Sequence, residues 1–130
     1  MYKLLALDLD GTLIGKELTI SSKTKNAIAQ LMSRGVTVTI ATGRMFQSAR
    51  PFAKELNIST PLICYQGAMV GNPVTGEILS HLPIPLPLAK QAIEAVRKEG
   101  LHINAYLDDQ LYVDHLNEHA ELYSVISKVE

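Results

Sequence analysis

The sequence predicts an α/β fold built on a parallel sheet. Three short apolar runs of strand length, at 3–9, 36–41 and 62–65, alternate with two stretches that read as helices. This order is typical of parallel strands joined by crossover helices, which are almost always right-handed. At 130 residues, 47% of them hydrophobic and 19% charged, the chain is long enough for a domain with its own core.

The first strand is expected at 3–9. Its nearly continuous apolar character is typical of a strand buried on both faces of a parallel sheet, with Asp8 near its carboxyl end. After a turn at Gly11, the serine pair at 21–22 offers an N-cap. Apolar residues at helical spacing then predict a crossover helix that stops at Gly35.

A second strand is predicted at 36–41, a β-branched apolar run that ends at the Thr-Gly-Arg triplet of residues 42–44. Pro51 suits the first turn of a following helix that runs to about Leu56. A third strand follows at 62–65. Polar residues therefore stand at the carboxyl ends of successive strands.

The next segment is a β-hairpin, because residues 68–70 and 77–82 flank a loop rich in turn formers. Prolines at 83, 85 and 87 cannot continue a helix or a central strand, so we place a domain boundary there, with units at 1–82 and 83–130. In the second unit we expect a helix at 88–99, a strand at 101–108 with one packed and one wet face, a turn at Asp108 and Asp109, a strand at 111–113, and a helix capped by Asn117.

Charge and cysteine usage exclude several classes of protein. The net charge of −1 arises from 12 basic and 13 acidic residues without long runs, which argues against nucleic-acid binding and against a polybasic membrane anchor. The lone Cys64 lies in an apolar run and suits a buried position in a reducing compartment. The N-terminal apolar stretch is too short and too acidic for a signal peptide or a spanning helix, so we expect a cytoplasmic protein.

The strand ends carry groups suited to phosphate chemistry. Asp8 and Asp10 would share one face of a strand, but Gly11 lets the chain bend and re-aim the second carboxylate. Ligands of open α/β sheets bind beyond the carboxyl ends of the strands, where 42–43 and 66–67 also fall. Glycine N–H groups and a threonine hydroxyl suit a phosphate, and paired carboxylates suit a divalent cation such as Mg²⁺. The spacing by itself leaves ordinary turn chemistry equally open.

Two of these segments resemble the first two motifs of the haloacid dehalogenase (HAD) superfamily: Asp-Leu-Asp-Gly-Thr-Leu at 8–13 and Ala-Thr-Gly-Arg at 41–44. Segments 61–68 and 100–113, with the hairpin between them, follow the pattern of Cof-type phosphatases. Members of that group carry a large α/β cap, of the C2 type, between their second and third motifs. The resemblance implies the first half of a HAD-like, Rossmann-like core at 1–82 and the start of a cap at 83–130.

The resemblance also implies a mechanism. Asp8 would attack the phosphorus to form an aspartyl-phosphate, and Asp10 would protonate the leaving alcohol and then activate water. Mg²⁺ would be held by a carboxylate oxygen of Asp8 and the main-chain carbonyl of Asp10. Thr42 and the Gly43 amide would hold a phosphate oxygen. Phosphate or substrate binding is likewise implied for Leu9, Gly11 and Arg44, although a surface or helix-start role for Arg44 stays open.

Some residues depart from the family pattern. Cof-type enzymes have Asn-Gly-Ala where this chain has Gln66-Gly67-Ala68, so a substrate contact from that position is open. The lysine of the third motif and the acidic pair of the fourth are not recognised, because Asp108 and Asp109 read as a turn and Lys128 as a solvated charge.

Two functions therefore stand. The first is a phosphatase of small phosphorylated metabolites such as sugar phosphates, weak or inactive as these 130 residues. The second is a non-catalytic module that recruits a second copy or a complementing chain through the open edge of the strand at 3–9.

The histidines offer a weaker metal site. His115 and His119 are four residues apart, a spacing that suits zinc on one helix, but the glutamate of His-Glu-x-x-His is absent and a cap at Asn117 leaves His115 outside the helix. His102 and Tyr106 lie on the polar face of the predicted strand at 101–108, where a cap residue could meet substrate. We expect all four to be ordinary surface residues.

Overall fold

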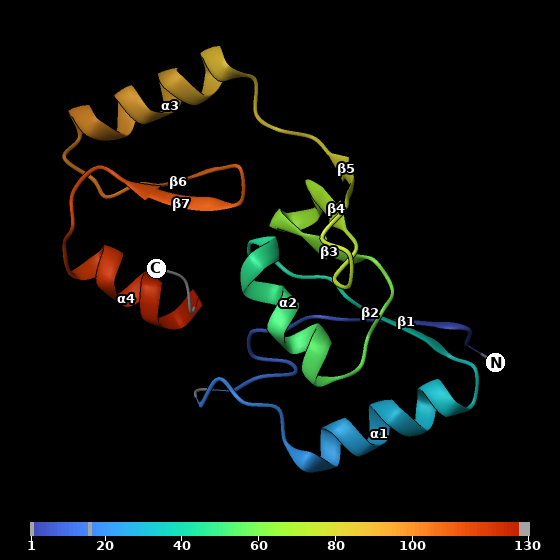
Figure 1. The fold of residues 1–130 in the computed structure, drawn as a ribbon. Helices are drawn as coiled ribbons and strands as arrows, with labels where there is room; N and C mark the ends of the chain where they lie inside the picture. Colours follow the sequence, from blue (N-terminus) through green and yellow to red (C-terminus); the bar gives the residue numbers. More distant parts are fainter. Residues whose placement is uncertain (1, 16, 128–130) are drawn as a thin grey trace. The chain divides into compact units, whose positions relative to one another are not determined.

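The computed structural model describes residues 2–15 and 17–127, and the chain divides into two compact units, Met1–His81 and Leu82–Glu130 (Figure 1). The division falls one residue before the predicted boundary, and the assignment of the units to core and cap stays a prediction. The first unit contains β1 (Leu4–Leu7), α1 (Ser22–Ser33), β2 (Thr37–Ile40), α2 (Phe46–Glu55), β3 (Leu62–Cys64), the 3₁₀ turn η1 (Tyr65–Gly67), β4 (Met69–Gly71) and β5 (Ile78–His81). The second contains α3 (Leu86–Lys98), β6 (Asn104–Leu107), β7 (Gln110–Val113) and α4 (Glu118–Ser127).

The parallel sheet predicted from the sequence is present. β1 and β2 pair in parallel, with Leu5 opposite Val38. β3 joins the far side of β2 through one parallel bridge between Ala41 and Ile63, where the Thr42 N–H donates to the Ile63 carbonyl at 2.9 Å. The carboxyl ends of β1, β2 and β3 therefore meet at one edge of the sheet.

The prediction that the first strand is buried on both faces is wrong for the structure described. Leu4 is 60% exposed, and Leu5 and Leu7 are only partly buried. Within residues 2–15 and 17–127, β2 is the one strand that pairs with β1, so the other edge of β1 is open. An apolar run without neighbours on each side cannot be fully shielded from water.

The core lies between the sheet and the helices, and it reaches directly beneath the strand ends. Val38, Ile40 and Leu62 of the strands pack with Ala49 and Phe52 of α2. The same cluster contains residues of α1 and of the loop after β1. The further members are Leu9, Leu13, Ile14, Ile20, Ile28, Phe46, Ala53, Leu56, Ile58, Cys64 and Met69.

The predicted start and stop of α1 are confirmed. The Ser21 hydroxyl accepts a hydrogen bond from the Thr24 N–H at 3.1 Å, as an N-cap does. Beyond the last helical residue, Gly35 takes a left-handed φ of 80° and its N–H bonds to the Met32 carbonyl at 3.0 Å.

The predicted start of α2 is wrong. The helix begins at Phe46 after an extended Met45, so Pro51 lies inside the helix and not in its first turn. Proline there removes one N–H donor. The apolar face that includes Phe46 and Phe52 is buried in the core, and this tertiary packing stabilises the early start.

The predicted hairpin is confirmed as the antiparallel pair β4–β5. Its loop is closed by Asn72, whose Oδ1 accepts hydrogen bonds from the N–H groups of Val74 and Thr75. The sequence did not predict that β4 also pairs antiparallel with β3, with Ile63 opposite Val70. This pairing attaches the hairpin to the sheet.

The second unit follows the predicted order with shifted bounds. α3 begins at Leu86, two residues early, because Pro87 is tolerated in a first helical turn. Asp108 and Asp109, with φ of 51° and 58°, form the predicted turn between β6 and β7. Asn117 caps α4 as predicted, since its Oδ1 accepts from the N–H groups of His119 and Ala120.

The alternating strand predicted at 101–108 is wrong. Only Asn104–Leu107 is a strand, and Leu101 and Leu107 of the expected packed face are 64% and 62% exposed. The hairpin formed by β6 and β7 therefore lacks a buried face. Alternation of apolar and polar residues does not by itself bury one face of a strand. No helix in the described ranges is long and apolar enough to cross a membrane.

Candidate active site

The loop after β1 holds two carboxylates around a buried anchor. Leu9 is fully buried, and its carbonyl accepts hydrogen bonds from the N–H groups of Leu13 and Ile14 at 3.0 and 2.9 Å. Gly11 takes a φ of 75°, which a residue with a Cβ rarely adopts, and its N–H donates to the Ile14 carbonyl. The chain thus bends at Gly11, as predicted, immediately after the second carboxylate.

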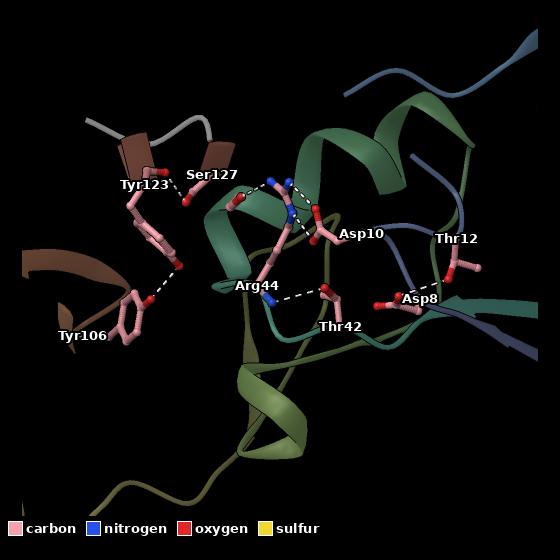
Figure 2. A network of polar contacts seen from close by, with 9 residues as sticks. Asp8, Asp10, Thr12, Thr42, Arg44, Tyr106, Tyr123 and Ser127 are labelled. Atoms are coloured by element: carbon pink, nitrogen blue, oxygen red, sulfur yellow. Dashed lines mark hydrogen bonds and ion pairs between the residues drawn. The ribbon is translucent and has the colours of Figure 1, made fainter. Parts of the chain in front are cut away.

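Asp8 is exposed at the end of β1 and makes a local hydrogen bond. Its Oδ2 accepts from the Thr12 hydroxyl at 3.2 Å, which holds the side chain against its own loop (Figure 2). An exposed carboxylate at a strand end can be reached by a ligand from solvent. The position suits the nucleophile implied by the resemblance.

Asp10 is turned to a different partner. Its two oxygens accept hydrogen bonds from Nε and Nη2 of Arg44, each at 2.8 Å (Figure 2). Half of the Asp10 side chain is exposed, whereas Arg44 is buried. Hydrogen bonding from Arg44 lowers the pKa of Asp10, burial opposes this, and the charge of Arg44 adds to the lowering.

Arg44 is itself held by the helix that follows it. Its Nη1 donates to the Ser48 hydroxyl at 3.0 Å, and its guanidinium lies 5.5 Å from the centre of the Phe52 ring. The Arg44 N–H also donates to the Thr42 hydroxyl at 3.2 Å. The second motif is therefore bonded both to the first motif and to α2.

The end of β3 closes against the end of β2. The Tyr65 N–H donates to the Arg44 carbonyl at 3.0 Å, and the Gln66 N–H donates to the Thr42 carbonyl at 3.3 Å. A Cβ on Gly43 would lie 2.3 Å from Nε2 of Gln66, so a larger residue at 43 would require the Gln66 amide to move. Tyr65 and Gln66 both have left-handed φ values, 51° and 57°. Gln66, where the family has asparagine, thus packs directly on the second motif.

The structure brings together most of the predicted site residues. Asp10 contacts Arg44, and Thr42 and Gly43 contact the turn at 65–67, whereas Asp8 bonds to Thr12. Sequence reasoning missed Ser48 and Phe52. The spacing of 44, 48 and 52 was a usable signal, because residues four apart near a helix share one face.

The available donors are suited to Mg²⁺. The exposed Asp8 carboxylate and the main-chain carbonyl of Asp10 are hard oxygen ligands, and Mg²⁺ commonly binds one or two carboxylates and keeps several waters. The carboxylate of Asp10 is engaged by Arg44, so Asp8 is the carboxylate that can face the cation. Within 2–15 and 17–127, no group of three His, Cys, Asp or Glu residues is arranged to hold a metal.

The histidine and tyrosine candidates belong to the second unit. His115 precedes α4, as expected from the Asn117 cap, and the rings of His102 and His119 are 5.7 Å apart. The Tyr106 hydroxyl donates to that of Tyr123, and burial, followed by this hydrogen bond, raises the pKa of Tyr106 above its usual range. Cys64 is buried, as predicted. Lys128 lies outside the described residues.

A family of haloacid dehalogenase-like hydrolases matches residues 5–129. The chain belongs to this family, which confirms the resemblance drawn from its motifs. The α/β fold with a parallel sheet agrees with that family.

Two relatives are phosphatases. The chain is 33% identical over 118 residues to the 5-amino-6-(5-phospho-D-ribitylamino)uracil phosphatase YitU of Bacillus subtilis, covering 89% of this chain and 44% of that protein. It is 32% identical over 117 residues to the pyridoxal phosphate phosphatase YbhA of Escherichia coli, covering 90% and 43%. The chain therefore spans less than half the length of these relatives.

The fold of the chain is also similar to that of a phosphatase of known structure. A sugar phosphatase of HAD subclass IIB superposes with a TM-score of 0.83 at 25% sequence identity, over 98% of this chain and 50% of that chain. The chain is thus similar to hydrolases of phosphoesters in both sequence and fold.

Proposed function

We propose that the protein is a Mg²⁺-dependent phosphatase of small phosphorylated metabolites, such as sugar phosphates, that works through an aspartyl-phosphate on Asp8. One observation carries the proposal: Asp8 and Asp10 flank the buried Leu9, yet one is exposed and the other is bonded to Arg44. Asp8 is thereby open to a ligand, while Arg44 holds Asp10 close by in the same loop. The phosphatase relatives support the reaction, and their ribityl, pyridoxal and sugar substrates support the substrate class.

The residues divide the chemistry between them. Asp8 attacks the phosphorus, so that hydrolysis is split into two easier steps. Asp10 gives a proton to the leaving oxygen and later takes one from water. The Thr42 hydroxyl and the Gly43 N–H would donate to phosphate oxygens. Phosphate binding is proposed for Leu9 and Gly11 as well, although the Gly11 N–H donates to the Ile14 carbonyl. A bound Mg²⁺ supplies positive charge that offsets the charge of the phosphate.

The test is the substitution Asp8→Asn, which keeps the shape and removes the nucleophile. We expect the 130 residues by themselves to show weak or no Mg²⁺-dependent hydrolysis of p-nitrophenyl phosphate, and any such activity should fall to background in Asp8→Asn. Beryllofluoride, which imitates a phosphoryl group on aspartate, gives a second readout by ¹⁹F NMR that needs no turnover. Its Mg²⁺-dependent bound signal should be absent in Asp8→Asn.

The matched control is Asp108→Asn, in the turn between β6 and β7, where asparagine tolerates the left-handed φ. It should leave both signals unchanged. Turnover by Asp8→Asn at the wild-type rate would refute Asp8 as the nucleophile. EDTA should abolish the activity of the wild-type protein, and activity that persists in EDTA would refute the metal requirement.

A further part of the proposal concerns partners and location. Among residues 2–15 and 17–127 one edge of β1 has no neighbouring strand, and Leu4 is 60% exposed, which supports self-association of these 130 residues or pairing with a complementing chain. Sedimentation should reveal species larger than a monomer, and a stable, cooperatively folding monomer would contradict this.

We propose a cytoplasmic location from the lone buried cysteine. The alternative of a non-catalytic module gains no support from the phosphatase relatives.

A further inference from the structure

Arg44 occupies an unusual place for a residue expected to bind phosphate. Its side chain is 6% exposed, although it lies at a strand end beside Asp10, whose side chain is 50% exposed. The planar edge formed by Nε and Nη2 faces Asp10, with one 2.8 Å hydrogen bond to each carboxylate oxygen (Figure 2). This paired geometry fixes direction as well as charge. The guanidinium is therefore directed at Asp10.

The other side of the guanidinium is fixed by α2. The Ser48 hydroxyl accepts from Nη1 at 3.0 Å, and the Phe52 ring lies 5.5 Å away, within the range of a cation–π contact. Ser48 is 3% exposed and Phe52 is 4% exposed. Buried side chains on one helix face have few alternative rotamers. A chain of contacts thus runs from the helix to Asp10.

We propose that Ser48 and Phe52 are positioning residues which, through Arg44, fix the direction of the Asp10 carboxylate. The inference rests on the proposed phosphatase function and deepens it. Asp10 is half exposed and has no second anchor of comparable strength among its described contacts. Without Arg44 its carboxylate could turn toward solvent. Arg44 thereby serves to hold the Asp10 carboxylate in one direction.

The proton balance shows what the positioning achieves. In the first step the Asp8–phosphorus bond forms and the bond from phosphorus to the ester oxygen breaks. The proton that passes to the ester oxygen is carried by an Asp10 oxygen that has given up its bond from Arg44, while the other Asp10 oxygen keeps its bond. In the second step the Asp10 carboxylate takes a proton from water as the water oxygen attacks the phosphorus, and the Asp8–phosphorus bond breaks, which releases phosphate and restores the Asp8 carboxylate. Both transfers need Asp10 within hydrogen-bond reach of the moving proton. A misdirected carboxylate slows them even when Asp8 is intact.

The dependence on leaving group separates positioning from general structural damage. p-Nitrophenolate departs readily without a proton, whereas the alkoxide of glycerol phosphate needs one. The ratio of kcat/KM for the two esters reports the step in which the leaving group departs. We compare wild type with Ser48→Ala, Phe52→Leu and Arg44→Lys. Ser33→Ala is the matched control, since Ser33 makes a local bond to the Gln30 carbonyl on α1.

We expect Arg44→Lys to reduce kcat/KM for glycerol phosphate about tenfold more than for p-nitrophenyl phosphate, because lysine cannot bind the carboxylate through a fork of two donors. Ser48→Ala and Phe52→Leu should shift the ratio in the same direction by about twofold to fivefold. Ser33→Ala should not shift it. Equal losses on both esters in all three variants would overturn the inference.

A second measurement decides the matter without turnover. The ¹³C signal of the Asp10 carboxyl carbon should move in Ser48→Ala and in Phe52→Leu, and stay in Ser33→Ala. An Asp10 signal identical to wild type in both α2 variants would overturn the inference. If the wild-type protein hydrolyses neither ester, which the expected weak or absent activity of these 130 residues allows, the Asp10 signal decides the positioning role, and the beryllofluoride signal tests the phosphatase proposal separately.

Discussion

The two units of the chain differ in how they bury their apolar residues. Met1–His81 holds a cluster of sixteen buried hydrophobic residues, whereas in the described part of Leu82–Glu130 the one buried hydrophobic residue is Ala120. α3 has no buried residue, although its spacing is as amphipathic as that of α2. An amphipathic helix therefore does not by itself create a core. The residues of the candidate active site belong to the first unit, which has a core.

The difference has a consequence for dynamics and function. A region with few buried apolar contacts opens at lower free energy than one with a dense core. The carboxylate loop and the second motif are supported by Leu9, Ile40 and Leu62, all fully buried. We therefore expect the candidate active site at the ends of β1 and β2 to stay ordered when the second unit unfolds locally.

The largest expected effect compares a core position of the first unit with an exposed position of the second. Leu62→Ala, at a fully buried position, should lower the free energy of unfolding by about 2–5 kcal/mol, through lost burial and a cavity. Leu122→Ala, at a position 59% exposed, should change it by about 0.5 kcal/mol or less. Urea titration followed by circular dichroism measures both. Equal losses in the two variants would break the comparison.

Two glycines compare the packing of the two units through smaller changes in stability. A Cβ on Gly71 would lie 2.7 Å from the Phe46 ring, which the core cannot easily move, so Gly71→Ala should cost about 1–3 kcal/mol. A Cβ on Gly100 meets nothing within 4 Å, and only its φ of 66° opposes alanine, at about 1 kcal/mol. Thermal unfolding of the two variants compares them. A larger loss at Gly100 would contradict the difference in packing.

The cap of α4 tests how independent the second unit is. Asn117→Ala removes the acceptor for two helix N–H groups and should destabilise the helix by about 1 kcal/mol. Amide hydrogen exchange should accelerate in α4 while β2 and α2 keep their protection. Ser21→Ala, which removes the matching cap of α1, is the control within the first unit. Faster exchange throughout both units after Asn117→Ala would show that they unfold together.

The smallest effect concerns acid. Arg44 holds the pKa of Asp10 below its ordinary value of 3.8, so the pair stabilises the fold above that pH and loses its contribution as pH falls through the lower folded-state pKa. Asp10→Asn should flatten this part of the stability curve in metal-free buffer. In high salt, Asp114→Asn should change the dependence of stability on pH less than Asp10→Asn does. The Arg97–Asp114 pair of the second unit is exposed, so salt screens it. Identical curves for wild type and Asp10→Asn would refute a contribution from the pair.

Local patterns predicted the elements well where local chemistry decides them. Ser21 and Asn117 as caps, Gly35 as a stop and the two aspartates of the β6–β7 turn were all readable, because each satisfies its own neighbouring backbone. The start of α2 was not readable from Pro51. The buried face of that helix outweighs the lost donor, and burial depends on residues distant in sequence.

The sequence alone determined the α/β class, the family motifs and the presence of Asp8, Asp10, Thr42 and Gly43 at strand ends. Only the tertiary structure decided what each side chain bonds to. The structure shows Arg44 bonded to Asp10 and to Ser48, with the Phe52 ring beside its guanidinium, and its expected phosphate contact stays a prediction. The physical reason is that a motif fixes the backbone locally, whereas the direction of a long side chain depends on the partners that folding brings within 3 Å.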